Sequence, residues 1–371
     1  MRVLHVIPFL WSGAGNVVTR LCLSQAATGD VAIVTSSRSK GFSDWPEYRK
    51  RLKAGGIRHI KIDFFDRDPA VFWRSVDSFE KLLGRWQPDL IHSHSGVPAC
   101  AAALSGHPFV AQLHSWGPGR PEWMNTMDLW GFRRADRVIC SSQAYRRILA
   151  EGDVDPSRIR CIPWGLDLKE LLLRGNPIRT DSKQSFRCGF LGRIEPRKGQ
   201  LELAKAFLRF HNRHPESELE LVGPVADEEY KAEIQQFIRK AGLGTAVRLT
   251  GKLANPYARM SGWNLFASLS HDEGQGLAAL EAMALGVPVL ARRVAGIEDY
   301  LHDQKTGLAV TSASETEVAD RMEWAFHHRQ DLRQIATRAR QMVETKYNWS
   351  TTLQQIGRVY ETFPRTHRRL A

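Results

Sequence analysis

Residues 270–288 read Ser-His-Asp-Glu-Gly-Gln-Gly-Leu-Ala-Ala-Leu-Glu-Ala-Met-Ala-Leu-Gly-Val-Pro. A glycine-rich turn opens this stretch, and a helical pattern follows it. The first N–H groups of a helix have no acceptor inside the helix and lie at its positive dipole end, so such a turn can hold a diphosphate. The N–H groups that this turn offers are those of Gly274, Gln275, Gly276 and Leu277.

Glu273 and Glu281 stand on the two sides of this turn and indicate the kind of ligand. A carboxylate repels a bound phosphate unless it points at neutral groups such as sugar hydroxyls. The two carboxylates therefore suit a nucleotide sugar better than a free phosphate ester. We expect them to flank the diphosphate and to bind hydroxyls.

The rest of the chain alternates short β-branched runs with amphipathic helical stretches, which is typical of a parallel, doubly wound sheet. The strands expected in the first half are residues 3–7, 31–35, 57–62, 89–92, 109–113, 137–140 and 158–162. Beyond an irregular polar stretch at residues 174–185, the expected strands are residues 186–191, 218–222, 247–250, 265–268 and 287–291. Because 371 residues exceed the usual size of one hydrophobic core, the pattern predicts two α/β domains joined by that stretch.

The composition favours an anionic partner. Lysine and arginine number 52 against 40 aspartates and glutamates, a net charge of +12 that suits nucleotide diphosphates, phospholipid head groups or nucleic acid. Basic clusters at residues 48–53, 132–134 and 145–147 fit peripheral contact with a membrane and a lipid-linked acceptor, and they fit ordinary solvated helix faces equally well. Five scattered cysteines and the lack of a long apolar run predict a soluble cytoplasmic protein, peripheral at the inner face of the cytoplasmic membrane if the basic clusters bind lipid.

Two other function classes compete with sugar transfer. A dinucleotide-dependent enzyme would use the Gly-x-Gly of Gly13 and Gly15, but the third glycine is lacking and the strand at residues 31–35 ends without an acid for a ribose. A nucleic-acid or phospholipid-binding module without catalysis would need a continuous basic stripe and would have no use for Glu273 or Glu281. We therefore expect no nucleic acid as a partner.

The sequence predicts neither a metal site nor a cofactor. No Asp-x-Asp motif lies in a suitable place, and His92-Ser93-His94 is the nearest approach to a metal motif. These histidines occupy alternate positions at a strand end, where both can point one way. Because a third ligand of suitable spacing is lacking, we expect His92 and His94 to be a hydrogen-bonding pair that lines a cleft between the two domains.

Several motifs resemble one enzyme family. Glu273 and Glu281 form Glu-x7-Glu, followed by Leu-Glu-Ala-Met-Ala-x-Gly-x-Pro-Val, and residues 192–199 read Gly-Arg-Ile-Glu-Pro-Arg-Lys-Gly. Residues 162–167 read Ile-Pro-Trp-Gly-Leu-Asp, and residues 295–299 read Ala-Gly-Ile-Glu-Asp. Together they resemble family 4 retaining glycosyltransferases of the GT-B fold.

The resemblance implies two Rossmann-like domains facing a central cleft, with a C-terminal helix that crosses back to the N-terminal domain. The expected boundaries are 1–172 for an acceptor-binding domain, 173–346 for a nucleotide-sugar-binding domain and 347–371 for the returning helix. Ligands of such sheets bind beyond the carboxyl ends of the strands.

The resemblance also assigns roles to residues. The expected catalytic residues are His114, which meets the donor sugar, Arg193, Lys198 and Glu273. Arg193 and Lys198 would stabilise the departing diphosphate, as a metal does elsewhere. The donor site is expected to include Gly13, Gly15, Arg193, Lys198, Glu273, Gly274, Gln275, Gly276, Leu277 and Glu281, with Glu298 shaping the pocket. The acceptor cleft is expected to include Asn16, His92, His94 and Trp116.

The implied reaction moves a sugar, with retention, from a nucleoside-diphosphate sugar, chiefly a UDP-sugar, to a hydroxyl of a glycan, lipid-linked or small-molecule acceptor. Attack on the front face lets the leaving phosphate take the acceptor proton. Two positions depart from the family pattern. Gln275 replaces Phe in residues 273–276, which we call the donor loop, and Trp164 replaces Asn in the 162–167 motif. Contacts near the sugar are therefore expected to differ.

Overall fold

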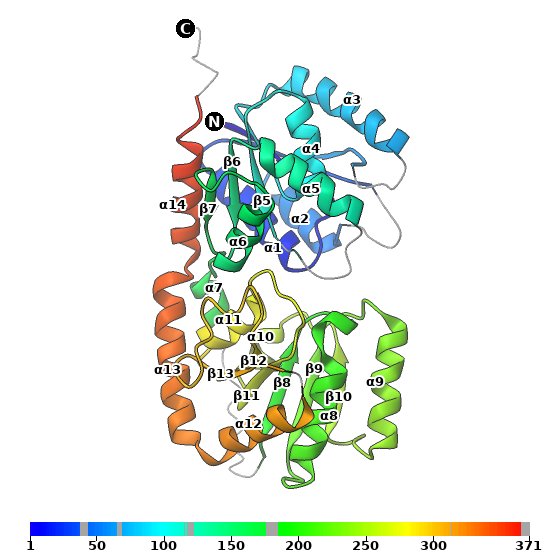
Figure 1. Cartoon of the computed structure of the whole chain (residues 1–371), viewed down its shortest axis with the longest axis vertical. Coiled ribbons are helices and arrows are strands. Elements are labelled where there is room, and N and C mark those ends of the chain that lie inside the picture. Colours follow the sequence, from blue (N-terminus) through cyan, green and yellow to red (C-terminus); the bar gives the residue numbers. More distant parts are fainter. Residues whose placement is uncertain are drawn as a thin grey trace. The chain divides into compact units, whose positions relative to one another are not determined.

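The structure is a computed structural model that describes residues 1–37, 44–64, 69–114, 116, 122–175, 185–312 and 314–364. The chain forms two compact units (Figure 1). The N-terminal unit comprises Met1–Pro163 and Thr352–Ala371, and the C-terminal unit comprises Trp164–Thr351. Each unit is a parallel sheet with its own helices, and each is described by itself below.

The N-terminal unit contains a seven-stranded parallel sheet in the order β3-β2-β1-β4-β5-β6-β7. Its strands are β1 (Arg2–Val6), β2 (Asp30–Thr35), β3 (Arg58–Lys61), β4 (Leu90–Ser93), β5 (Phe109–Leu113), β6 (Arg137–Cys140) and β7 (Ile159–Cys161). Its helices are α1 (Ser12–Ala26), α2 (Pro46–Ala54), α3 (Pro69–Trp86), α4 (Gly96–Leu104), α5 (Glu122–Arg134) and α6 (Gln143–Glu151). Every residue of β4 and β5 is buried, as expected for central strands covered on both faces.

The C-terminal unit contains a six-stranded parallel sheet in the order β10-β9-β8-β11-β12-β13. Its strands are β8 (Arg187–Leu191), β9 (Glu218–Val222), β10 (Val247–Gly251), β11 (Leu265–Ser268), β12 (Val289–Arg292) and β13 (Leu308–Val310). Its helical elements are α7 (Leu168–Arg174), η1 (Pro196–Lys198), α8 (Gln200–His211), α9 (Glu228–Lys240), α10 (Pro256–Met260), α11 (Leu277–Ala284), α12 (Glu315–His327) and α13 (Arg329–Lys346).

Strand order reverses once in each sheet. The chain moves outward from β1 to β3 and then returns to the other side of β1 with β4, and it does the same around β8 with β11. The carboxyl ends of the two strands at such a reversal form a crevice where α/β proteins bind ligands. The reversal therefore indicates two places for a site. One is at the carboxyl ends of β1 and β4, which we call the β1/β4 edge, and the other is at the carboxyl ends of β8 and β11.

The sequence pattern predicted the strands closely. All the expected strands occur, and their bounds differ from the expected ones by at most two residues. The structure adds one strand, β13, that is not among the expected ones. On α8, Leu203, Ala206, Phe207 and Phe210 recur at helical spacing and are fully buried, so they form the apolar face that packs on the sheet.

The borders of the units differ from the expected domain boundaries at 172/173 and 346/347. Leu166 and Leu171 belong to the C-terminal unit because they pack into its core with Leu280 and Met283. The Leu166 N–H also donates to the Tyr347 carbonyl oxygen at 2.7 Å. The expected joining stretch, residues 174–185, lies almost entirely outside the described residues.

The last helix, α14 (Trp349–Tyr360), begins in the C-terminal unit and belongs to the N-terminal unit from Thr352 onward (Figure 1). Its Tyr360 hydroxyl reaches His92 of β4, at 2.5 Å from Nδ1. In the described part of the chain, no helix combines the length and the apolar character that a bilayer span requires.

Candidate active site

The glycine-rich turn lies at the start of α11, as the sequence predicted. Gly276 is the N-cap residue and has a left-handed φ of +68°. A side chain there would come within 2.6 Å of the Tyr300 hydroxyl, and one at Gly296 would come within 2.4 Å of the Glu273 carbonyl oxygen. Glycine at both positions therefore lets the turn close tightly, and the first N–H groups of α11 have no acceptor within the helix.

Lys198 and Glu273 form a close ion pair at this turn. The Lys198 ammonium lies 2.6 Å from Glu273 Oε1, and the Ser270 hydroxyl donates to the same oxygen at 2.8 Å. Burial by itself raises the pKa of Glu273, but Lys198, Arg197 and Ser270 together hold that pKa below its ordinary value. Glu273 is therefore an ionised carboxylate at neutral pH.

A second glycine explains how Lys198 reaches Glu273. Gly199 follows the short helix η1 and has a φ of +66°, and a Cβ atom at this position would come within 2.5 Å of the Leu269 carbonyl oxygen. The His271 N–H donates to the Arg197 carbonyl oxygen at 2.9 Å. These two contacts hold η1 against the end of β11, and the Lys198 side chain lies beside the donor loop as a result.

Arg193 is held by a carboxylate that the sequence analysis missed. Its guanidinium lies 2.9 Å from Glu195 Oε1, and the same oxygen lies 3.1 Å from Arg197. Arg197 in turn donates to the Asp272 carbonyl oxygen at 2.7 Å. Glu195 and Arg197 both lie inside the motif at residues 192–199, whereas the contact of Arg197 with Asp272 joins segments 75 residues apart.

The N-terminal unit brings four histidines together at the β1/β4 edge. His5 of β1 pairs in register with His92 of β4, and both His5 and His92 are fully buried. His94 follows β4 and His114 follows β5, and the His94 Nδ1 lies 3.0 Å from the His114 Nε2. The structure thus unites the three expected histidines with a fourth, His5, which the sequence analysis did not select.

Comparison with known protein families identifies the family of this chain. The model for glycosyl transferases group 1 matches residues 178–342, and the model for Glycosyltransferase Family 4 matches residues 11–170. This chain is a group 1, family 4 glycosyltransferase. The match decides against the dinucleotide-dependent enzyme and against the binding module without catalysis.

Individual relatives show the range of the family. A D-inositol 3-phosphate glycosyltransferase of Paenarthrobacter aurescens is 28% identical over 69% of this chain and 69% of its own length. A glycogen synthase of Mycobacterium tuberculosis is 24% identical over 97% of this chain and 94% of its own length. The crystal structure of Anabaena HepE with UDP and glucose superposes with a TM-score of 0.82, at 20% identity, over 98% of this chain and all of HepE. The GT-B fold expected from the sequence is therefore confirmed.

In this glycosyltransferase, Gln275 does not lie as expected. Its side-chain oxygen accepts from the Trp164 N–H and its side-chain nitrogen donates to the Trp164 carbonyl oxygen, both at 2.7 Å. Gln275 is 5% exposed, and both the oxygen and the nitrogen of its side chain bond to this backbone. The two residues that depart from the family pattern, Trp164 and Gln275, thus contact each other. This contact ties the donor loop to the first residue of the C-terminal unit.

Glu281 lies half-buried on α11, and its Oε1 accepts from the Tyr257 hydroxyl at 3.0 Å. The Arg174 guanidinium lies over the Tyr257 ring, 4.9 Å from its centre. Tyr257 therefore orients the carboxylate that was expected to bind donor hydroxyls. Glu298, expected to shape the pocket, is half-buried in the turn after β12.

Gly13 and Gly15, expected in the donor site, both lie in the first turns of α1. Gly15 is buried, and a side chain there would come within 2.7 Å of the Leu10 backbone. Its smallness serves helix packing, and its backbone is fixed by a hydrogen bond from its N–H to the Trp11 carbonyl oxygen at 2.9 Å. Asn16, expected in the acceptor cleft, accepts from Arg51 at 2.8 Å.

Trp116, expected in the acceptor cleft, is held in place through its backbone. Its backbone N–H donates to the Tyr145 hydroxyl at 3.0 Å, and its side chain is half-buried. Residues 115 and 117–121 lie outside the described part of the chain. His92 and His94, expected to line the same cleft, are 0% and 1% exposed, so their rings pack inside the unit.

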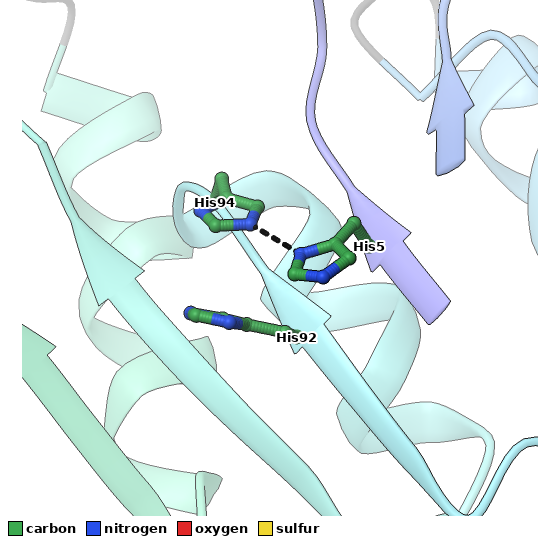
Figure 2. A group of neighbouring side chains, drawn as sticks. All are labelled: His5, His92 and His94. Atoms are coloured by element: carbon green, nitrogen blue, oxygen red, sulfur yellow. Dashed lines mark hydrogen bonds between the residues drawn. The ribbon is translucent and has the colours of Figure 1, made fainter. Parts of the chain in front are cut away.

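The expected reason against a metal at His92 and His94 was wrong, because the structure supplies a third histidine, His5. The nearest ring nitrogens of the three lie within 4.8 Å of one another. However, His5 and His94 are 2.9 Å apart, a hydrogen-bond distance, whereas nitrogens that share a zinc ion lie roughly 3.3 Å apart. His92 stacks on His94, with ring centres 4.2 Å apart and ring planes 29° apart (Figure 2).

Proposed function

We propose that this glycosyltransferase moves a sugar from a UDP-sugar to an acceptor hydroxyl with retention of configuration. The observation that carries the proposal is the Lys198–Glu273 pair at the N-terminus of α11. It sets a cation and a carboxylate side by side where a diphosphate meets a sugar. HepE, crystallised with UDP and glucose, supports the choice of nucleotide.

The C-terminal unit binds the donor in this proposal. The N–H groups at the start of α11 and the charges of Arg193 and Lys198 take the diphosphate, and Glu281 takes the ribose hydroxyls. Glu273 accepts hydrogen bonds from the sugar. Because Glu195 and Glu273 already hold the two cations in place, the phosphate meets preorganised charges instead of mobile ones.

The transfer itself needs few protein groups. The bond between the anomeric carbon and the β-phosphate oxygen breaks while the acceptor oxygen bonds to the same face of the sugar. The acceptor proton passes to the departing phosphate, whose growing negative charge Arg193 and Lys198 stabilise. Two cationic side chains in this position make a divalent metal unnecessary, and we propose that the reaction is metal-independent.

The acceptor is proposed to bind the N-terminal unit through a hydroxyl of a glycan, a lipid-linked sugar or a small molecule. Closure of the two units would then bring acceptor and donor together and exclude water, which otherwise hydrolyses the donor. A lipid-linked acceptor would use the basic clusters of the N-terminal unit for peripheral contact with anionic lipid.

A donor screen tests the proposal. The full chain should be stabilised against heat by UDP, less by GDP, and not by NADH or DNA, and it should hydrolyse or transfer one UDP-sugar in the presence of excess EDTA. Loss of activity in EDTA with rescue by magnesium or manganese would contradict metal independence. Stabilisation by GDP alone would contradict the choice of nucleotide.

A further inference from the structure

A cluster of two histidines and a glutamate lies in the C-terminal unit, outside the proposed donor site. It comprises His214, which follows α8, and Glu323 and His327 of α12. The Glu323 Oε1 lies 2.9 Å from the His214 Nε2 and 3.0 Å from the His327 Nε2. All three atoms lie within 4.8 Å of one another. The fold thus brings two imidazole nitrogens and a carboxylate oxygen together from segments that lie 109 residues apart.

Packing holds His214 in this position. Its ring contacts Phe326 of α12, with ring centres 4.0 Å apart, and Phe210 of α8, with ring centres 4.7 Å apart. Its backbone N–H donates to the Phe210 carbonyl oxygen at 3.1 Å, and α8 packs against α12. The His214 side chain is 16% exposed. A side chain that is held in place before it binds a metal loses little freedom when it does so.

Glu323 and His327 extend from the same face of α12, because they stand four residues apart on the helix. Two side chains at this spacing can bind one metal ion. Burial by itself raises the pKa of Glu323, but hydrogen bonds from His214 and His327 and the charge of Arg213 hold that pKa below its ordinary value. The cluster therefore offers an ionised carboxylate to a cation.

The ligand atoms suit a divalent transition metal. Imidazole nitrogens bind zinc and related ions, whereas magnesium and calcium prefer oxygen ligands. Two histidines and one glutamate can hold zinc with water in the fourth position. Each imidazole then binds through the lone pair of Nε2 and carries its proton on Nδ1. The ion takes the place of the proton that each ring otherwise shares with Glu323.

This cluster differs from that of His5, His92 and His94 in charge and in exposure. Three buried neutral imidazoles cannot offset the charge of a dication, and burial of an uncompensated charge is costly. Glu323 supplies a negative charge, and the His327 side chain is 58% exposed, so water can reach the ion. Ligand atoms around zinc lie roughly 3.3 Å apart, so the two contacts of Glu323 need to open by only about 0.3 Å.

We propose that His214, Glu323 and His327 bind one divalent transition-metal ion of the zinc class, which joins α12 to the segment after α8 and stabilises the C-terminal unit. The site lies far from the donor loop. Helix α8 begins beside Gly199 and Lys198 and is 12 residues long, so its two ends lie roughly 18 Å apart. Figure 1 shows α12 at the lower end of the C-terminal unit. An ion at this end takes no part in sugar transfer.

Arg213 is the neighbour that opposes a cation. Its guanidinium lies 3.2 Å from the Glu323 Oε2, and its side chain is 50% exposed. Arg213 can keep this oxygen while Oε1 binds the ion, but its positive charge lowers the affinity. Arg213→Gln should therefore tighten zinc binding roughly threefold, whereas the loss of a ligand weakens it.

Calorimetry with zinc chloride on the full chain, cleared of metal with EDTA and then dialysed, tests the site. We expect one ion per chain, bound with a Kd below about 10 μM. His214→Gln and Glu323→Gln should each weaken binding at least tenfold, since even the loss of an outer partner of a metal ligand costs about 10–100-fold. His328→Gln should keep the affinity, because this exposed histidine follows His327 but stacks on Trp324.

Thermal unfolding shows whether the ion stabilises the unit. Zinc at about 100 times its Kd should raise the Tm of the C-terminal unit by about 5 °C in the wild type and in His328→Gln, but not in Glu323→Gln. Glu323→Gln keeps the shape of the side chain and an acceptor oxygen, so we expect it to fold. A wild type that binds no zinc, or equal zinc affinity in the wild type, His214→Gln and Glu323→Gln, would overturn the proposed site. Zinc binding at the cluster without a change in Tm would overturn its stabilising role.

Discussion

At the residue scale, the site is built from charges that are paired before any ligand arrives. Lys198 and Glu273 share a short contact, and Arg193 shares Glu195 with Arg197. In half-buried pairs of this kind, each charged side chain holds the other in position. Removal of one partner leaves an uncompensated charge away from water and is destabilising. The sequence predicted Arg193 and Lys198 as site residues, but it did not predict that Glu195 and Glu273 pair with them.

Replacement of Lys198 by methionine should lower kcat by roughly 10²–10³-fold, as for the loss of one preorganised donor to a developing charge. The pKa of Glu273 should rise, because burial then acts without its strongest opposing charge. Initial rates under saturating donor measure kcat, and a pH profile measures the carboxylate. Lys240→Met, at an exposed lysine of α9, is the control. Near-normal kcat in folded Lys198→Met would remove Lys198 from the mechanism.

Replacement of Glu281 by alanine should weaken UDP binding by about 1–3 kcal/mol, because the ribose hydroxyls would lose their acceptor. Calorimetry with UDP on the full chain measures this affinity. Tyr257→Phe removes the hydrogen bond to Glu281 but keeps the carboxylate, so its loss should be smaller. Equal affinity of wild type and Glu281→Ala would show that Glu281 does not bind the nucleotide.

At the element scale, glycines with left-handed backbone connect strands to helices where the site forms. Gly199 and Gly276 both end a connection and start a helix, α8 and α11 respectively. The sequence predicted the turn before α11 from its glycines. Gly13 and Gly15 lie in the first turns of α1, and nothing local in the sequence distinguishes a glycine needed for a turn from one needed for helix packing.

Gly199→Ala should destabilise the C-terminal unit by more than Gly242→Ala. Both positions have nearly equal left-handed φ values, +66° and +69°, so both variants lose about 1–2 kcal/mol from backbone strain. Only at Gly199 does the added methyl group also meet a backbone oxygen, at 2.5 Å, whereas nothing lies within 4 Å at Gly242. Urea unfolding gives the two losses, and Gly199→Ala should also weaken UDP binding because Lys198 precedes it. Equal losses would mean that the Leu269 contact yields without cost.

At the scale of the whole molecule, the histidines of the N-terminal unit make stability depend on pH. His5, His92, His94 and His114 all have pKa values below 6.5 in the folded chain. Between about pH 4 and 6.5, the unfolded chain therefore binds more protons, and the free energy of unfolding rises with pH. This stabilisation is complete above pH 6.5 and is lost as the pH falls toward 4.

Urea unfolding at several pH values between 4.5 and 7.5 measures this dependence in the transition of the N-terminal unit. His92→Gln keeps an acceptor for Tyr360 and removes one titrating ring, so the slope should fall by up to about 1.4 kcal/mol per pH unit. His328→Gln, at an exposed histidine of the C-terminal unit, should leave the slope unchanged. An unchanged slope in His92→Gln would show that folding does not lower the pKa of His92.

The sequence by itself determined the strands, the glycine turn before α11 and the family, because each depends on residues that are neighbours in the chain. Apolar period, turn glycines and motif spacing are local, and the structure followed them closely. Only the tertiary structure decided the partners within the site. Lys198 meets Glu273 across 75 residues, and His5 meets His94 across 89. These contacts arise because the strand order reverses at β1 and at β8, so that the carboxyl ends of strands far apart in the chain lie side by side. No local sequence pattern specifies which side chains then face each other.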